Sequence, residues 1–314
     1  MSAEITLFVL FNVFILLMLA IDLGVFNRKA HTISLKEAVV WSIVWTVLAL
    51  AFNVGVYVWA GSTKALEFFT GYLIERALSF DNIFVFVLIF SYFGVPPRYH
   101  HRALFWGVVG ALVTRSIFIA AGTALISRFE WVLYIFGVIL IISGWKMLSS
   151  DSLEVHPDKN LFIRTARRLF PVAPGFDTAN FFVRIGGRLH LTPLFLVLLT
   201  IETTDIVFAV DSIPAVFGVT QDPFIVYSSN VFAILGLRAT YFLLAGVMDT
   251  FHYLSHGLSF VLIFIGLKML LDHFVPVPIG VSLLVVGVIL TVAIVASLVK
   301  LRTDRKKAEK QGGV

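Results

Sequence analysis

Long apolar windows follow one another along almost the whole chain, separated by short polar segments. Each window holds enough apolar residues to cross about 30 Å of hydrocarbon as a helix. The first has no Lys or Arg before it and no small-residue cleavage site after it, which favours a retained helix over a signal peptide. The pattern predicts nine membrane-spanning helices: Ile5 to Phe26, Ala38 to Ala60, Glu67 to Phe93, Ala103 to Ile126, Trp131 to Leu148, Thr192 to Phe217, Phe224 to Val247, Gly257 to Leu271 and Pro276 to Val299.

The composition agrees with this pattern. Hydrophobic residues make up 59% of the chain and charged residues only 14%, which lies well outside the usual range of soluble domains. We therefore expect an all-α polytopic membrane protein.

One segment, 149–190, is not expected to lie in the membrane, because it contains charged residues of both signs and three prolines. It separates two membrane portions, 1–148 and 191–300, and a basic tail follows at 301–314. We expect a cytoplasmic linker in which NLFIRTARRLF forms an amphipathic helix at the membrane surface and FFVRIGGRLHL a hairpin about Gly186 and Gly187. A plain solvated linker is the alternative.

The distribution of Lys and Arg predicts the orientation. With the N-terminus outside, the outer loops hold only Lys64 and Arg128. The inner segments hold Arg28, Lys29, Lys36, Arg98, Arg102, Lys146, Lys159, Arg164, Arg167, Arg168, Arg184, Arg188 and the tail from Lys300. By the positive-inside rule the C-terminus is cytoplasmic, and the basic tail indicates contact with anionic lipid rather than nucleic acid.

The chain also repeats itself. GWKML at 144–148 is echoed by GLKML at 266–270, TRSIFIAAG at 114–122 by LRATYFLLAG at 237–246, and LSFDNIFVF at 78–86 by IETTDIVFAVDS at 201–212. The third to fifth helices thus correspond to the sixth to eighth. Because three helices is an odd number, the second copy enters the membrane from the opposite side, as in transporters built from inverted repeats.

Several ionisable residues lie inside the predicted spans. A carboxylate near the midplane costs roughly 2.5 to 3.5 kcal/mol, so these charges need compensation. Five acids and three arginines together carry a net formal charge of −2, which one divalent cation would neutralise. The acids are Glu75, Asp81, Glu202, Asp205 and Asp211, and the basic residues are Arg76, Arg115 and Arg238. We expect Arg115 and Arg238 to balance the acidic cluster.

Helical geometry restricts how these acids can meet. Glu202 and Asp205 share a helix face, whereas Asp205 and Asp211 lie about 120° apart. A common ion site therefore needs several helices or a break in one. Pro214 offers a break, because it cannot donate to the carbonyl of Val210, which then becomes a candidate cation ligand.

The available donors select the class of ion. The chain has no cysteine, which excludes thiolate metal sites and thiol redox chemistry. Oxygen donors suit hard cations such as Mn²⁺, Mg²⁺ and Ca²⁺. We expect His252 and His256 to be solvated at the membrane–water interface and not to bind the ion.

The acidic motifs E-x5-D-N and E-x2-D-x5-D-S-x-P, the nine-helix layout and the segment TQDPFIV resemble the TerC family, most closely its Alx-type bacterial members. The resemblance covers residues 5–300. It implies a non-enzymatic manganese exporter of the bacterial cytoplasmic (inner) membrane, in a family linked by name to tellurite resistance, with Ca²⁺ and other hard divalent cations open as further cargo. The implied ion path consists of Glu75, Asp81, Glu202, Asp205 and Asp211, with Asn82 and Ser212 as neutral oxygen ligands or partners.

Three other functions compete with this one. An intramembrane aspartyl protease also uses two membrane carboxylates, but the sequence has no GxGD segment. A transporter of tellurium oxyanions needs exposed arginines, and here the acids outnumber the arginines. A membrane factor that delivers metal to exported proteins would use the same site. The expected mechanism is alternating access between the inverted halves, with the carboxylates binding Mn²⁺ when ionised and taking up protons when it leaves.

Overall fold

Helices make up most of the described chain in the computed structural model, which describes residues 3–21, 34–149, 160–176, 178–245 and 253–311. The predicted all-α membrane fold is confirmed, and six of its helices are long and apolar enough to cross a membrane. Every predicted window contains helix. The elements are α1 (Ala3–Ile21), α2 (Leu35–Phe93), α3 (Pro97–Arg128), α4 (Val132–Ser149), α5 (Leu161–Leu169), β1 (Phe182–Ile185), β2 (Arg188–Leu191), α6 (Pro193–Phe217), α7 (Pro223–Leu235), α8 (Leu237–Leu244), α9 (Leu254–Leu271) and α10 (Ile279–Gln311).

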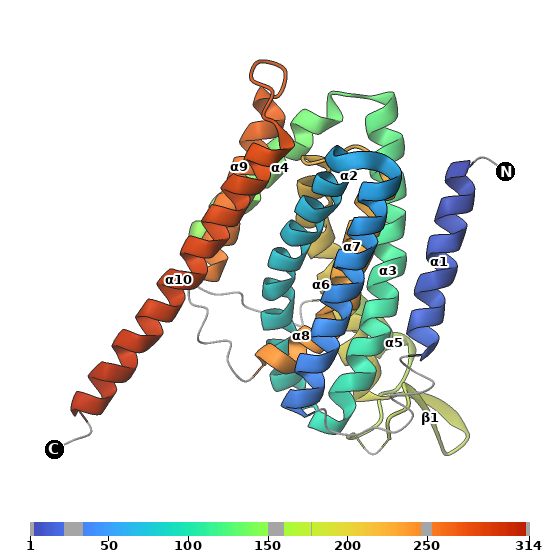
Figure 1. The fold of residues 1–314 in the computed structure, drawn as a ribbon. Helices are drawn as coiled ribbons and strands as arrows, with labels where there is room; N and C mark the ends of the chain where they lie inside the picture. The colour runs from blue at the N-terminus through green and yellow to red at the C-terminus, as the bar shows by residue number, and fades with distance from the viewer. Residues whose placement is uncertain (1–2, 22–33, 150–159, 177, 246–252, 312–314) are drawn as a thin grey trace.

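Helix α2 contains both the second and the third predicted spans. Its 59 residues would reach about 88 Å if straight, far beyond the hydrocarbon thickness. Instead α2 folds back on itself at Gly61 (Figure 1), whose φ of 86° and ψ of 177° only glycine adopts easily. The separate loop expected between these spans is therefore wrong, and a bend replaces it. We call the part of α2 after Gly61 its second arm.

The bend defines one end of the molecule, here the bend end. Lys64 beside the bend pairs with Asp222, at 3.2 Å between Nζ and Oδ2, so the α6–α7 connection lies at this end too. The β1–β2 hairpin lies at the opposite end, here the hairpin end (Figure 1). The predicted topology requires the bend and the α6–α7 connection to share one side.

The helix break expected at Pro214 is wrong, because α6 continues through Pro214 to Phe217. The break occurs in the seventh span, where α7 ends and α8 begins around Gly236. The guanidinium of Arg76 packs over Gly236 and leaves no room for a Cβ. Arg76 Nη1 also donates to the carbonyl of Ala233 at 3.3 Å, which satisfies a backbone acceptor near this break.

Helices α4 and α9 cross in close contact through glycines. A Cβ on Gly144 would lie 2.7 Å from the carbonyl oxygen of Ser259, and one on Gly266 would lie 2.6 Å from that of Gly137. The repeat matches Gly144 with Gly266 and Gly137 with Ser259. The two contacts are therefore the same contact, made once by each repeat. A second pair repeats in the same way, with Gly144 against Ile263 and Gly266 against Ile141, both at 2.8 Å to Cγ1.

The same two-fold relation holds for the helices that begin each repeat. Gly71 of α2 meets Ser229 of α7, and Gly107 of α3 meets Ile201 of α6, with 2.9 Å from the added Cβ to the nearest side-chain atom in both. These pairs exchange to within one residue when Asp81 is matched with Asp211 and Arg115 with Arg238. Reciprocal contacts of this kind are what a two-fold axis produces, and they support the predicted inverted repeat.

The linker contains the expected hairpin. Strands β1 and β2 pair antiparallel through a turn in which Gly186 and Gly187 have φ of 57° and 80°, a conformation that favours glycine. In α5, Ile163 is buried against Leu191 and Leu196. The outer face of α5 exposes Leu161, Phe162 and Leu169, as an amphipathic helix at a membrane surface would.

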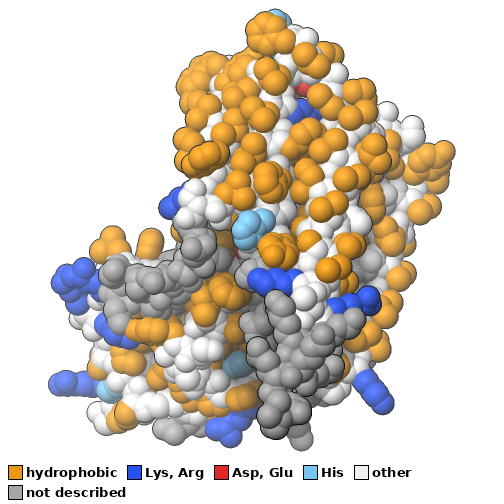
Figure 2. Space-filling model, turned by 90° about the vertical axis from the view of Figure 1, so that its left-hand side faces the viewer, with side chains coloured by type: hydrophobic (Ala, Val, Ile, Leu, Met, Phe, Trp, Pro, Cys, Tyr) orange, Lys and Arg blue, Asp and Glu red, His pale blue; other side chains and the backbone are white. Residues whose placement is uncertain are grey.

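The surface matches an environment of lipid. Large apolar side chains such as Val58, Trp145 and Leu284 are exposed, and orange apolar atoms cover the upper part of Figure 2, while most visible Lys and Arg lie in its lower half. Exposed apolar belts of this extent suit a bilayer rather than water. Arg28, Lys29, Lys159 and His252, used in the sequence interpretation, lie outside the described residues.

Candidate functional site

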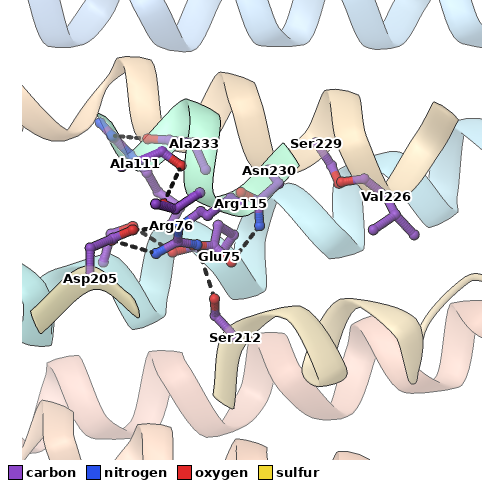
Figure 3. Close-up of polar contacts among 12 residues, drawn as sticks. Glu75, Arg76, Ala111, Arg115, Asp205, Ser212, Val226, Ser229, Asn230 and Ala233 are labelled. Atoms are coloured by element: carbon purple, nitrogen blue, oxygen red, sulfur yellow. Dashed lines mark hydrogen bonds and ion pairs between the residues drawn. The ribbon is translucent and has the colours of Figure 1, made fainter. Parts of the chain in front are cut away.

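Five polar residues from four helices meet in the interior of the bundle (Figure 3). Each is at most 2% exposed. We call this group the Arg115 cluster. Its members are Glu75 of α2, Arg115 of α3, Asp205 and Ser212 of α6, and Asn230 of α7.

Arg115 lies at the centre of this cluster and binds both carboxylates. Its Nη2 and Nε donate to Asp205 Oδ1 and Oδ2 at 3.0 and 3.3 Å, which is the bidentate geometry typical of Arg–carboxylate pairs. Its Nη1 donates to Glu75 Oε1 and to Ser212 Oγ at 2.9 Å. Asn230 Nδ2 donates to Glu75 Oε2 at 3.0 Å. With both acids ionised, the cluster carries one excess negative charge.

The close approach of the helices explains this geometry. The Gly71 and Gly107 contacts bring α7 against α2 and α6 against α3, as small residues commonly do between membrane helices. Glu202 lies one turn before Asp205, and its carboxylate fills the space above Gly110 of α3, where a Cβ would overlap it. Glu202 therefore lies on the same α3–α6 interface as the cluster.

Asp81 and Asp211 lie outside the Arg115 cluster, and each meets a serine of the other repeat. Ser255 of α9 donates to Asp81 Oδ1 at 3.1 Å, and Ser143 of α4 donates to Asp211 Oδ1 at 2.6 Å. Asp81 is 7% exposed, and its Oδ2 has no hydrogen-bond partner in the part of the chain that the structure describes.

The remaining predicted site residues occupy different surroundings. Asn82 is 2% exposed, beside Asp81 in sequence, whereas the side chain of Val210 is 43% exposed on the outer face of α6. Arg238 is 7% exposed and lines a small cavity with Trp45, Phe105 and other apolar residues. It is not among the residues bonded within the Arg115 cluster, although it matches Arg115 in the repeat.

The five carboxylates do not surround one point. Within the described ranges, no three His, Asp or Glu side chains lie close enough together to hold one metal ion. The position between Glu75 and Asp205 is taken by the guanidinium of Arg115. The structure instead distributes oxygen donors over three places: the Arg115 cluster, Asp81 with Ser255, and Asp211 with Ser143.

A cavity of about 690 Å³, lined by both polar and apolar side chains, opens at the bend end, where α6 finishes. We call it the bend cavity. Thr220 Oγ1 donates to Glu67 Oε2 at 2.5 Å, Lys64 Nζ contacts the same oxygen at 2.9 Å, and Lys268 Nζ donates to the carbonyl of Gly218 at 3.1 Å. Its polar lining consists of Lys64, Glu67, Thr220, Gln221, Asp222, Lys268 and Asp272.

Sequence reasoning missed the bend cavity. Its residues lie at helix ends and in connections, where polar side chains are ordinary and carry no signal of a shared space. The TQDPFIV segment carries the family resemblance but no sign of a cavity, although Thr220 and Asp222 within it line one.

Comparisons with known proteins agree with the fold and the motifs. The family model described as "Integral membrane protein TerC family" matches residues 60–308. An uncharacterized membrane protein of Myxococcus xanthus is 52% identical over 93% of this chain and 92% of its own length. Proteins named "Putative membrane-bound redox modulator Alx" are similar as well. The one from Salmonella typhi is 48% identical over 91% of both chains, and that of Escherichia coli K12 is 46% identical over 95% of this chain and 96% of its own.

No solved structure is significantly similar to the chain. The family model covers more than three quarters of the sequence, including both acidic motifs and both repeats. The relatives align over nearly their whole lengths. The chain therefore belongs to the TerC family of integral membrane proteins.

Proposed function

We propose that the chain moves a divalent cation, with Mn²⁺ as its main cargo, across the membrane by alternating access. The observation that carries this proposal is the Arg115 cluster, in which carboxylates from both repeats share one guanidinium deep in the bundle. Ionisable residues held inside membrane helices usually mark an ion pathway. The excess of acid over base in this pathway favours a cation over an anion.

The chemistry of the donors favours a hard cation. Asp81 and Asp211 each have a serine hydroxyl beside the carboxylate, and such oxygen donors suit Mn²⁺, Mg²⁺ and Ca²⁺. The carbonyl of Val210, to which Pro214 cannot donate, is a further proposed ligand beside Asp211. Along α6 the acids Glu202, Asp205 and Asp211 follow one another toward the bend cavity.

Arg115 gives this pathway a competing positive charge. It holds Glu75 and Asp205 when no cation is near, which avoids two unpaired buried carboxylates. A divalent cation that approaches either acid has to displace the guanidinium from it. Arrival of the cation therefore loosens Arg115 from one carboxylate. When the cation departs, the ionised carboxylates pair with Arg115 again, and proton uptake by the other acids of the pathway offsets the remaining negative charge.

Two other functions use features of the same chain. A factor that delivers metal to exported proteins would use the same oxygen donors without net flux. Tellurium oxyanion transport is less well supported, because Arg115 is already bonded to two acids. The Salmonella typhi and Escherichia coli relatives carry the name "Putative membrane-bound redox modulator Alx", but this chain has no cysteine, so a redox role in it would not use thiols.

Ion flux in proteoliposomes tests the proposal. Entry of Mn²⁺, Mg²⁺ and Ca²⁺ should be measured with and without a pH gradient, for the wild type, for Glu75→Gln and for Glu130→Gln. Glu130 is an exposed acid in the α3–α4 connection and serves as the matched control. We expect Mn²⁺ entry with the wild type and Glu130→Gln and a large loss with Glu75→Gln. No flux with a folded wild type, together with Mn²⁺ binding, would favour metal delivery.

We further propose a location in the bacterial cytoplasmic membrane with the bend end outside and the C-terminus in the cytoplasm. The Lys64–Asp222 pair supports a shared side for residues 63 and 221, and the asymmetry of Lys and Arg supports the absolute direction. Single cysteines at 63, 165 and 221, all exposed positions, can be labelled cleanly, because the chain has none. Labelling of 63 and 221 from outside and of 165 only after permeabilisation is the expected pattern, and the reverse pattern would overturn the orientation.

A further inference from the structure

The two repeats contact the α4–α9 pair in different registers. Asp211 meets Ser143 of α4. By the correspondence of Gly144 with Gly266 and of Asp81 with Asp211, the equivalent contact would join Asp81 to Ile265 of α9. Asp81 instead meets Ser255, which is ten residues earlier in α9.

A second contact shows the same difference in register. The rings of Phe136 in α4 and Phe217 in α6 lie 6.1 Å apart, and their equivalents are Leu258 in α9 and Val87 in α2. These two belong to different packed clusters. Leu258 packs in a cluster with Ala77 and Leu78, whereas Val87 packs in a separate cluster at the hairpin end.

The difference in register has a direction and a size. Ten residues of α-helix correspond to about 15 Å along the axis. Helices α4 and α9 lie toward the bend end, and their lower ends in Figure 1 are well above those of α2 and α3. The glycine contacts within the α4–α9 pair and those among α2, α3, α6 and α7 obey the two-fold relation to within one residue. The Asp81–Ser255 and Phe136–Phe217 contacts between these two groups do not.

We propose that α4 and α9 move as one unit by about 15 Å along α6 and the second arm of α2, and that this sliding is the alternating-access step. In the second end state the first repeat has the register that the second repeat has now, and the reverse holds for the second repeat. The two end states therefore have equivalent packing. This inference rests on the proposed transport function and adds to it which helices move, in which direction and how far. The glycine contacts of Gly144 and Gly266 keep the pair together during the step.

The exchanged state has defined contacts. Asp81 leaves Ser255 and lies opposite Ile265, close to Lys268, while Asp211 leaves Ser143 and lies opposite Leu133. In the present state Lys146, the equivalent of Lys268, is within electrostatic reach of Asp211, and Lys268 donates to the carbonyl of Gly218. Sliding thus takes Lys146 away from Asp211, brings Lys268 to Asp81 and releases Lys268 from the bend cavity.

Cysteine pairs distinguish the two states. Gly218 and Ile265 are in contact in the present structure, so Gly218→Cys/Ile265→Cys should cross-link in this state. Val87→Cys/Leu258→Cys should cross-link only in the exchanged state. Gly107→Cys/Ile201→Cys is the matched control within the unmoving helices, because 4.0 Å separates its two Cβ positions, within the range for a disulfide.

We expect all three pairs to cross-link in native membranes under an oxidant. The first two should each block ion movement, and reduction should restore it. If the control and Gly218→Cys/Ile265→Cys cross-link fully while Val87→Cys/Leu258→Cys never does, the sliding is refuted.

A second measurement avoids buried substitutions. Spin labels on Thr63, near the bend, and on His273, at the end of α9, sit at exposed positions. Two distance populations that differ by an amount of the order of 15 Å along the helix axis are expected, and a single population under all ion and pH conditions would contradict the proposal. Neither the cross-linking nor the spin-label distance depends on which ion is transported. Cross-linking in both registers without Mn²⁺ flux would therefore retain the motion and reject the proposed cargo.

Discussion

The Arg115 cluster and the bend cavity both pair basic with acidic side chains, but in different surroundings. Arg115, Glu75 and Asp205 are at most 2% exposed and are joined by two ion pairs. In the bend cavity the side chain of Lys64 is 34% exposed and that of Asp222 31%. Water can replace a lost partner in the bend cavity and cannot do so in the cluster. Loss of one charge should therefore matter far more in the cluster.

The largest effect is expected from removal of the central charge of the cluster. Arg115→Gln leaves Glu75 and Asp205 without their shared partner, and breaking a buried pair of this kind typically costs about 3–5 kcal/mol. Thermal unfolding should show a lower midpoint and a larger gain on addition of Mn²⁺ than in the wild type, since the cation can then neutralise the freed acids. Arg128→Gln, at the exposed end of the same helix, is the control. An Mn²⁺-dependent gain equal to that of the wild type would place Arg115 outside the cation pathway.

A smaller effect on stability but a strong one on transport is expected at Asp211. Asp211→Asn keeps the size and one oxygen and removes the charge, so Mn²⁺ flux should fall roughly 10- to 100-fold, the factor that a charged hydrogen-bond partner typically represents. The protein should still insert and fold, because Ser143 can bond an amide oxygen. Asp211→Glu should also fail if geometry matters. Normal flux with Asp211→Asn but none with Asp81→Asn and Asp205→Asn would make Asp211 a structural partner only.

Pro214 separates backbone from charge effects on the same helix. Pro214→Ala restores a donor to the carbonyl of Val210 without altering charge, which withdraws that oxygen from the cation. Flux should fall roughly two- to tenfold, which corresponds to the net 0.5–1.5 kcal/mol of one hydrogen bond. Flux equal to that of the wild type would remove the Val210 carbonyl from the proposed ligands.

The smallest effect is expected in the bend cavity. Lys64→Ala removes the contacts to Glu67 and Asp222, and such partly exposed pairs contribute roughly 0–1 kcal/mol. The unfolding midpoint should change little, and the change should shrink further as salt is added. A loss as large as that of Arg115→Gln would show that the two regions do not differ as their exposure implies.

Hydropathy was sufficient to locate every helix-containing window, because long apolar runs are required wherever the chain crosses lipid. It could not reveal that Gly61 bends one continuous helix, that α6 passes through Pro214 unbroken, or that Gly236 ends α7. These outcomes depend on local packing, such as the Arg76 guanidinium over Gly236. A sequence pattern carries no direct sign of such contacts.

The candidate site shows the same limit. The sequence identified Glu75, Asp205 and Arg115 as costly charges in lipid and so as residues that need partners. It could not assign both acids to the same arginine, because they lie on different helices. Arg238 matches Arg115 in the repeat but lines an apolar cavity. Arg115 lies within the continuous α3, whereas Arg238 follows the break at Gly236. Matched positions in a repeat therefore need not share surroundings when the helix of one copy is broken.

Mn²⁺ entry into proteoliposomes, compared between the wild type and Asp81→Asn/Asp211→Asn, tests the central claim most directly. Both substituted acids lie outside the Arg115 cluster, so its charge balance is kept and the double variant should fold. We predict entry above that of empty liposomes for the wild type and for the exposed-acid control Glu130→Gln, and entry equal to that of empty liposomes for the double variant. Wild-type entry no greater than that of empty liposomes, or undiminished entry with the double variant, would contradict transport through these carboxylates.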